Sequence, residues 1–181
     1  MQLITWIYNN KINTTINQII VNIYYLGDEG FDPLGFSTIQ EVGIDLYWLR
    51  EAELKHARIA MIASLGFIAQ EKGLFLIPSN SHNQVTTFYE YAKAYPSSLA
   101  FFVVLVGIAE LFSGIAITEG RKGDRAPGDY GFNPLNFGRK EATLKDLSLK
   151  EIRNGRLAML ASAGMLVQST IFSDAGVLDS L

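Results

Sequence analysis

The chain has 181 residues, of which 49% are hydrophobic and 18% are charged, and its formal net charge at pH 7 is −3. A chain of this length forms one domain or at most two, and its negative charge argues against a general nucleic-acid-binding protein. Because it contains no cysteine, the sequence excludes disulfides, zinc–thiolate sites and a cysteine nucleophile.

Residues 1–26 are rich in Ile, Asn and Tyr, and Lys11 is the one charged residue among them. They have neither the Arg-rich, Ser-rich composition of a transit peptide nor a small-residue cleavage site. We expect this segment to form an extended or partly helical N-terminal arm on residues 27–181, which are expected to form one domain of three helices. The helices are expected at about residues 45–73, 97–120 and 147–172.

Two loops of similar sequence precede the first and third helices. Residues 27–36 read Gly-Asp-Glu-Gly-Phe-Asp-Pro-Leu-Gly-Phe, and residues 128–137 read Gly-Asp-Tyr-Gly-Phe-Asn-Pro-Leu-Asn-Phe. Both loops combine turn-forming Gly, Pro, Asp and Asn with aromatic side chains. Each repeat unit is therefore a Phe-Asx-Pro-Leu loop followed by a helix. The loops are either helix-entry turns alone or also a binding surface.

The predicted helices differ in how clearly they read as membrane spans. A membrane span needs about 20 residues. In the first helix the uncharged residues 59–70 are too few, and this length is reached only if the charged turn before them is included. Residues 99–117 of the second helix are apolar except for Glu110, Ser113 and Gly114. The second helix is therefore the clearest membrane helix of the three.

The charges of the connecting loops agree with three spans. We expect a polar loop at residues 74–96 and a charged loop at residues 118–145. Residues 71–98 contain two lysines and no arginine, whereas residues 118–150 contain seven lysines and arginines. By the positive-inside rule, the second loop and the N-terminus lie on the same, non-translocated side of the membrane.

The first and third helices carry two copies of one helical sequence. Glu-Leu-Lys-His-Ala-Arg-Ile-Ala-Met at residues 53–61 returns 98 positions later as Glu-Ile-Arg-Asn-Gly-Arg-Leu-Ala-Met. In each copy the Glu and the Arg are five positions apart, a spacing at which side chains on one helix do not meet. Each therefore needs a partner from the other copy. The sequence predicts two reciprocal ion pairs around a local two-fold axis, Glu53 with Arg156 and Glu151 with Arg58.

The sector between the Glu and the Arg must then face the partner helix. It forms a seam of small and apolar residues, which lets two helices approach closely, as membrane helix pairs do. The expected seam residues are Ala57, Met61, Ser64 and Ile68 in the first helix and Gly155, Met159, Ser162 and Leu166 in the third.

The opposite sector has a polar group at each end and mostly small apolar residues between. It carries His56, Ala60, Ala63, Phe67 and Gln70 in the first helix and Asn154, Ala158, Ala161, Met165 and Gln168 in the third. Polar side chains that point into an apolar region need a partner. A flat apolar ligand with a metal at its centre fits such a face, because alanines leave room for the plane and His, Asn or Gln offers one axial atom.

The two copies and the loop at residues 27–36 resemble the light-harvesting chlorophyll-binding family. The likeness covers about residues 27–172, and Arg-Glu-Ala-Glu-Leu-Lys-His at residues 50–56 is most similar to the algal branches, which carry chlorophylls a and c with xanthophylls. The resemblance implies an all-α membrane protein with three transmembrane helices, of which the first and third cross. The N-terminus and residues 118–150 would lie on the stromal side of a plastid thylakoid membrane.

The resemblance further implies an antenna subunit, for which no catalytic group is required. Its partners would be the core of photosystem I or II, neighbouring antenna subunits and thylakoid lipids. Magnesium is a hard ion that takes oxygen or nitrogen ligands, and it is expected only within chlorophyll. A Glu ligand suits a dry site only if an Arg neutralises its charge.

The pigment contacts that the resemblance implies fall on both helices and both loops. Axial ligands to chlorophyll magnesium would be Glu53, His56, Glu151, Asn154 and Gln168. The middle helix would add Glu110 or Glu119, and Gln70 enters by repeat symmetry. The loops would contact two central carotenoids through Phe31, Asp32, Pro33, Leu34, Phe132, Asn133, Pro134 and Leu135. Green-plant members often have a His ligand after the third span, but residues 169–181 contain none.

Other functions remain open. A photoprotective quencher is the alternative within the family. Glu-x-x-His at residues 53–56 is also half of a di-iron carboxylate site, although the second copy reads Glu-x-x-Asn and the Arg beside each Glu would repel iron. A small transporter built on a repeat would line an interior path with its polar residues, whereas His56 and Asn154 face outward. Glu110 could instead be structural, and the two Gln residues could lie at the membrane surface.

Overall fold

The computed structural model describes most of the chain between residues 26 and 172. The described residues are 26–35, 46–74, 83–122, 125–135, 137–138 and 140–172. Their helices are α2 (Leu46–Glu71), α3 (Gln84–Ala94), α4 (Pro96–Lys122) and α5 (Glu141–Ile171), and the described chain contains no strand. The predicted N-terminal arm, apart from Leu26, and the tail after residue 172 lie outside the described residues.

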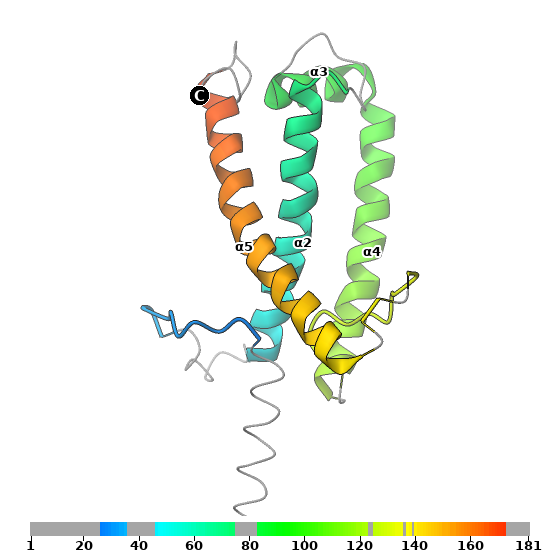
Figure 1. The fold of residues 1–181 in the computed structure, drawn as a ribbon. Helices are drawn as coiled ribbons and strands as arrows, with labels where there is room; N and C mark the ends of the chain where they lie inside the picture. Colours follow the sequence, from blue (N-terminus) through cyan, green and yellow to red (C-terminus); the bar gives the residue numbers. More distant parts are fainter. Residues whose placement is uncertain are drawn as a thin grey trace, which may run out of the picture.

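The long helices α2 and α5 cross each other, and α4 runs alongside α2 (Figure 1). The short helix α3 lies across one end of the bundle, whereas the loops before α2 and α5 lie toward the other end. Among the described elements, α2 and α5 form the main interface, and α4 packs much more loosely on α2. The architecture therefore consists of a crossed helix pair with a third long helix beside it.

The crossing is built on the smallest side chains of the two helices. Ala57 is only 1% exposed, and a Cβ added to Gly155 would overlap with the Cβ of Ala57. These two residues occupy the same position in the two sequence copies. The closest approach thus lies at the centre of the repeat, where a local two-fold axis would pass. The side chains of Leu54, Ala60, Ile152 and Ala158 are buried around it.

The predicted seam is correct at its centre and wrong at its far end. Ile68 and Leu166 were expected to face the partner helix, but they are 44% and 51% exposed. Ala60 and Ala158 were expected on the outward face, but both are buried. The physical reason is that the helices cross and then diverge (Figure 1). Ser64 is still in contact, because its Oγ donates to the carbonyl of Ala158 at 3.3 Å, whereas Ile68 and Leu166 lie beyond this point.

The segment between α2 and α4 is not only a loop. We predicted a polar loop over residues 74–96, whereas the structure contains α3 there. Asn83 caps this helix, because its Oδ1 accepts hydrogen bonds from the backbone N–H groups of Val85 at 2.9 Å and Thr86 at 3.2 Å. The helix α5 also begins earlier than predicted, at Glu141 rather than at residue 147.

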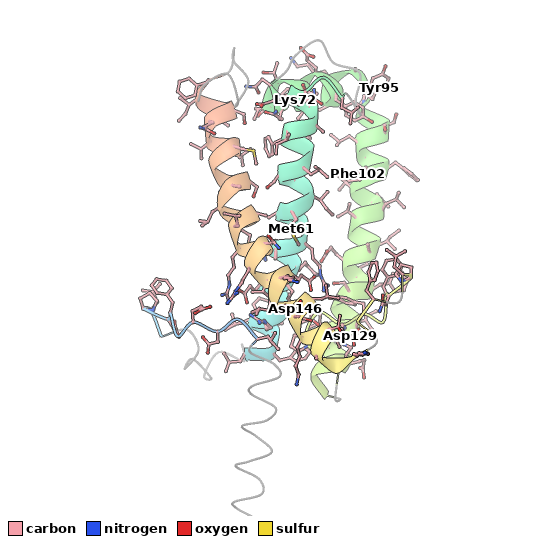
Figure 2. All side chains as sticks on the ribbon, viewed as in Figure 1. Met61, Lys72, Tyr95, Phe102, Asp129 and Asp146 are labelled. Carbon is pink, nitrogen blue, oxygen red and sulfur yellow. The ribbon has the colours of Figure 1, made fainter. Side chains whose placement is uncertain are left out.

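One helix of the described chain is long and apolar enough to cross a membrane by itself, namely α4 over Pro96–Gly120. The helices α2 and α5 carry the charged residues of the repeat in their first halves. Figure 2 shows Lys72 and Tyr95 at one end of the bundle and Asp129 and Asp146 toward the other. Polar groups therefore lie at both ends of the bundle, and apolar helical segments lie between them.

Candidate functional site

Two ion pairs join the crossed helices. Arg58 on α2 donates from Nε to Oε1 of Glu151 on α5 at 2.6 Å. Arg156 on α5 donates from Nε to Oε1 of Glu53 on α2 at 2.8 Å. All four side chains are about one-quarter to two-fifths exposed. The partners are those that the five-residue spacing predicts, and each pair cancels a charge that would otherwise be stranded between apolar helices.

Each arginine also holds a loop, which the sequence did not predict. Nη1 of Arg156 donates to the carbonyl of Gly27 at 2.7 Å, and Nη1 of Arg58 donates to the carbonyl of Gly128 at 3.0 Å. Both glycines have positive φ angles, of 80° and 78°. At Gly128 an added Cβ would also overlap with the Leu54 side chain. A positive φ angle is the backbone conformation that glycine adopts most readily, so both loops have glycine at the residue whose carbonyl meets an arginine.

The two loops share an internal turn. Oδ1 of Asp28 accepts from the N–H of Gly30 at 2.8 Å, and Oδ1 of Asp129 accepts from the N–H of Gly131 at 2.9 Å. The turn leaves large apolar side chains uncovered: Phe31, Leu34, Phe132 and Leu135 are between 71% and 87% exposed. Such exposed apolar groups are suited to contact an apolar partner or lipid.

The remaining predicted loop residues lie in the same two turns. Asn133 closes the second turn, because its amide donates to the carbonyl of Phe137 at 2.8 Å and accepts from the Phe137 N–H at 3.1 Å. The first turn is closed by the backbone, with the N–H of Gly35 donating to the carbonyl of Asp32 at 3.2 Å. Pro33 and Pro134 are exposed turn residues.

His56 and Asn154 occupy equivalent positions, and each is oriented by its own helix. Nδ1 of His56 lies 2.7 Å from the carbonyl of Ala52, and Nδ2 of Asn154 donates to the carbonyl of Lys150 at 2.9 Å. A carbonyl can only accept, so Nδ1 of His56 carries a proton, and in the neutral imidazole Nε2 is then the atom with the lone pair. In Asn154 the same contact leaves Oδ1 as the outward acceptor. Both side chains are exposed.

The two glutamines at the far ends of the helices are not equivalent. Nε2 of Gln70 donates to Oγ1 of Thr87 on α3 at 3.2 Å. Within the described chain, the side chain of Gln168 has no hydrogen-bond partner. The helix α3 causes the difference, because it lies against Gln70 and contacts the end of α5 through another residue: Asn83 donates to the carbonyls of Ser169 at 2.9 Å and Phe172 at 3.1 Å.

Glu110 on α4 pairs with a lysine on α2. Nζ of Lys55 lies 2.8 Å from Oε2 of Glu110 and also donates to Oγ of Ser113 at 2.5 Å. The Glu110 side chain is 53% exposed. Glu110 and Glu119, the other predicted ligand of this helix, line one shallow surface depression on α4 together with Gly114. The lysine neutralises Glu110 as the arginines neutralise the glutamates of the crossing.

A buried carboxylate cluster between α2, α4 and the loop before α5 escaped prediction. Glu51 is 1% exposed, and it accepts from Arg125 at 2.7 Å and from the hydroxyl of Tyr130 at 3.2 Å. Burial by itself lowers the pKa of Arg125, but the facing Tyr47 and Glu51 outweigh this effect and raise it. An added Cβ at Gly120 would overlap with the Arg125 side chain. The cluster therefore ties the end of α4 to the start of α2.

These donors fit a metal that arrives within a macrocycle better than a free ion. No group of three or more His, Asp or Glu side chains that could hold a metal ion occurs among the described residues. Each of His56 and Asn154 instead offers one outward nitrogen or oxygen atom, and the glutamates are neutralised by cations. A magnesium ion that lacks only one axial ligand, and that takes nitrogen or oxygen, needs no more than this.

Comparison with known proteins agrees with this geometry. The chlorophyll a-b binding protein family matches residues 22–170, which include both loops and every site residue described above. The chain belongs to this family. A tomato (Solanum lycopersicum) chlorophyll a-b binding protein 8 is 35% identical over 175 residues, which cover 80% of this chain and 64% of that protein. The chain thus spans slightly less than two thirds of that relative.

Two further relatives come from algae. The fucoxanthin-chlorophyll a-c binding protein of Isochrysis galbana is 36% identical over 159 residues, covering 80% of this chain and 73% of that protein. The light-harvesting complex stress-related protein 1 of Chlamydomonas reinhardtii is 35% identical over 156 residues, covering 80% and 61%. The chlorophyll-binding family that the helix repeat and the loop resemble is thus confirmed.

Proposed function

We propose that the chain is an antenna subunit that binds chlorophylls and carotenoids and passes excitation energy to a photosystem core. One observation carries this proposal: both helix copies present an outward donor atom, on His56 and Asn154, whose other polar atom is fixed by the carbonyl four residues earlier. Side chains fixed in this way hold their ligands at a set distance and orientation, and energy transfer depends on both.

The proposed ligand set includes charged and neutral side chains. His56, Asn154 and Gln168 would bind chlorophyll magnesium as neutral ligands, whereas Glu53, Glu151 and Glu110 would bind it as carboxylates neutralised by Arg156, Arg58 and Lys55. Gln70 is the weakest candidate, because its amide already contacts α3. The chlorophyll would supply four magnesium ligands and the excited state, and the chain supplies the fifth ligand.

The proposed setting is a thylakoid membrane crossed by α2, α4 and α5. The apolar length of α4 supports this topology, as does the neutralisation of the charges on α2 and α5 by reciprocal pairs. The excess of Lys and Arg in residues 118–150 supports a stromal position for that loop and the N-terminus. In this setting the partners are a photosystem I or II core, neighbouring antenna subunits and thylakoid lipids.

The proposed pigments are chlorophyll a, an accessory chlorophyll of the c type and xanthophylls, which similarity to a fucoxanthin-chlorophyll a-c binding protein supports. The exposed apolar side chains of the two Phe-Asx-Pro-Leu loops would contact the ends of two carotenoids lying beside the crossing. Each loop is anchored on an arginine of the crossing, so the carotenoid ends and the chlorophyll ligands would be held by one rigid unit.

Reconstitution with purified pigments tests the proposal. The parent should bind chlorophyll a and xanthophyll, and its chlorophyll fluorescence should be excited through a carotenoid band. Replacing Asp32-Pro33-Leu34 by Gly-Gly-Gly should loosen one carotenoid and lower that band, because close fixed contact is lost. The same change at residues 133–135 is the matched control and should affect the other carotenoid. A parent that binds no chlorophyll would contradict the proposed function, and loop variants with unchanged carotenoid content would reduce the loops to helix-entry turns.

A photoprotective role is the second candidate, and similarity to a stress-related relative favours it. The fluorescence lifetime of the reconstituted complex separates the two roles. A harvesting subunit should keep the long lifetime of isolated bound chlorophyll, whereas a quencher should shorten it strongly.

A further inference from the structure

The two glutamates of the crossing differ in their second carboxylate oxygen. Oε2 of Glu53 accepts a hydrogen bond at 2.5 Å from Nη1 of Arg50, one turn earlier on α2. Within the described chain, the equivalent oxygen of Glu151 has no partner. The residue that corresponds to Arg50 in the second copy is Ser148, whose short neutral side chain cannot replace a guanidinium group.

Arg50 is fixed in this position. Its side chain is 8% exposed, and Nη2 donates to the carbonyl of Leu26, the residue before the first loop. A guanidinium group held by both a carboxylate and a backbone carbonyl cannot swing away without breaking two hydrogen bonds. The second oxygen of Glu53 is therefore engaged by a cation that is itself held in place.

The consequence is a difference in local charge. Glu53 lies between two arginines, Arg50 and Arg156, whereas among the residues that the structure describes Glu151 pairs with Arg58 alone. The first site therefore carries a net positive charge, and the second is neutral. A carboxylate that already accepts charge-assisted hydrogen bonds on both oxygens has less electron density to offer a metal than one with a free oxygen.

We propose that Arg50 is a positioning residue that makes Glu53 the weaker and Glu151 the stronger axial ligand for chlorophyll magnesium. This inference rests on the proposed function. It gives the two halves of a nearly symmetric crossing one pigment that exchanges readily and one that is retained. It also places a net positive charge beside only the first pigment, so the two pigments absorb at different energies.

The experiment first assigns one absorption band to each glutamate in the reconstituted complex. The double variants Glu53→Leu/Arg156→Leu and Glu151→Leu/Arg58→Leu remove each ligand together with its cation from the opposite helix. In the first of these variants Arg50 keeps only the carbonyl of Leu26 as a partner, whereas the second variant leaves no cation of the pair behind. The band missing from each difference spectrum belongs to that site. The rate at which each band then disappears in excess mild detergent measures how tightly each pigment is held.

The informative variants leave both glutamates in place. Arg50→Gln should slow loss of the Glu53 pigment about tenfold, the effect of one charge-assisted hydrogen bond, and should shift only that band. Ser148→Arg should hasten loss of the Glu151 pigment. Arg50→Lys, which keeps the charge, should resemble the parent. A merely structural role for Arg50 would instead weaken all pigments together and shift neither band alone.

The outcomes separate the inference from the function. If both double variants lose one chlorophyll but Arg50→Gln hastens or does not change loss of the Glu53 pigment, this inference is overturned and the proposed function stands. If neither double variant loses a chlorophyll, both glutamates cease to be ligands and the inference falls with that assignment. If the double variants do not assemble, chlorophyll retention by Arg50→Gln and Ser148→Arg in detergent still decides it, since the first should retain more and the second less than the parent.

Discussion

The two repeat units are nearly identical where they meet and different where they meet the rest of the molecule. At the crossing, each Arg binds the Glu and the loop carbonyl of the opposite unit, and the same small residues touch. Away from it, Lys55 on α2 pairs with α4 at 2.8 Å, whereas its counterpart Arg153 on α5 reaches Glu29 of the first loop at 3.6 Å. The two repeat units thus make equivalent contacts only where they contact each other.

This difference teaches where each kind of residue can be varied. A residue at the crossing contacts the other repeat unit, so a substitution there changes the environment of residues in both units. A residue outside the crossing contacts an element that occurs once, such as α3 or α4, and its counterpart is free to differ. Lys55 is an example, because it pairs with Glu110 on α4 and its counterpart in the second copy is Arg153.

The largest expected effect comes from breaking an ion pair of the crossing. Arg58→Leu should strand Glu151 and release the loop at Gly128, and we expect a loss of about 2–3 kcal/mol, below the roughly 3–5 kcal/mol of a fully buried pair because these side chains are partly exposed. Arg156→Leu should cost less, because Glu53 keeps Arg50 as a partner, although the loop at Gly27 is released in the same way. A thermal melt followed by pigment circular dichroism would measure both.

The control is the double variant Arg58→Leu/Glu151→Leu, which strands no charge and should recover part of the loss. A single variant that melts like the parent would mean that the pairs do not hold the crossing.

The next effect tests the symmetry of the contact itself. Gly155→Ala places a methyl group against Ala57 and should destabilise the complex by about 2 kcal/mol, because two helices must separate. Adding Ala57→Gly moves the methyl group to the other side of the axis, so the double variant should recover most of that loss. Gly164→Ala, where an added Cβ meets nothing within 4 Å, should be nearly neutral in the same melt.

If the double variant is as unstable as Gly155→Ala alone, the closest approach of the helices lies elsewhere.

A smaller effect is expected at the end where α3 joins the pair. Asn83→Ala removes both the cap of α3 and the donor to the last carbonyls of α5, at about 1 kcal/mol. Asn83→Asp keeps the capping oxygen and removes only the donor. Hydrogen exchange of the last turn of α5 should therefore rise in both variants, whereas the start of α3 should open only in Asn83→Ala. If the last turn of α5 exchanges at the same rate in the parent and in both variants, Asn83 does not hold the end of α5.

The partners of the charged residues could be predicted from the sequence because a Glu and an Arg five positions apart cannot satisfy each other. The same reasoning could not reveal that each Arg also binds a loop glycine, because a backbone carbonyl leaves no mark in the sequence. The pairing of Lys55 with Glu110 depends on how α4 lies against α2, and only one copy of α4 exists for comparison. The predicted seam ran too far because the angle of crossing does not follow from helical spacing.

The helix α3 was missed for a different reason. Its N-terminal Asn83 is a good capping residue, but it follows a polar segment with Pro78, and Pro96 follows the helix closely. Short helices of mixed polarity gain most of their stability from tertiary contacts, and those contacts are made with the ends of α2 and α5 rather than with neighbours in sequence.

The most direct test of the central claim is the chlorophyll-to-protein ratio after removal of one neutral ligand. Reconstituted His56→Leu and Asn154→Leu should each lose about one chlorophyll and keep their helical content, because both side chains are exposed and, within the described chain, hydrogen-bond to their own helix alone. Each should also melt closer to the parent than Arg58→Leu does. If both variants bind as much chlorophyll as the parent, the outward donors are not pigment ligands and the account of this site is wrong.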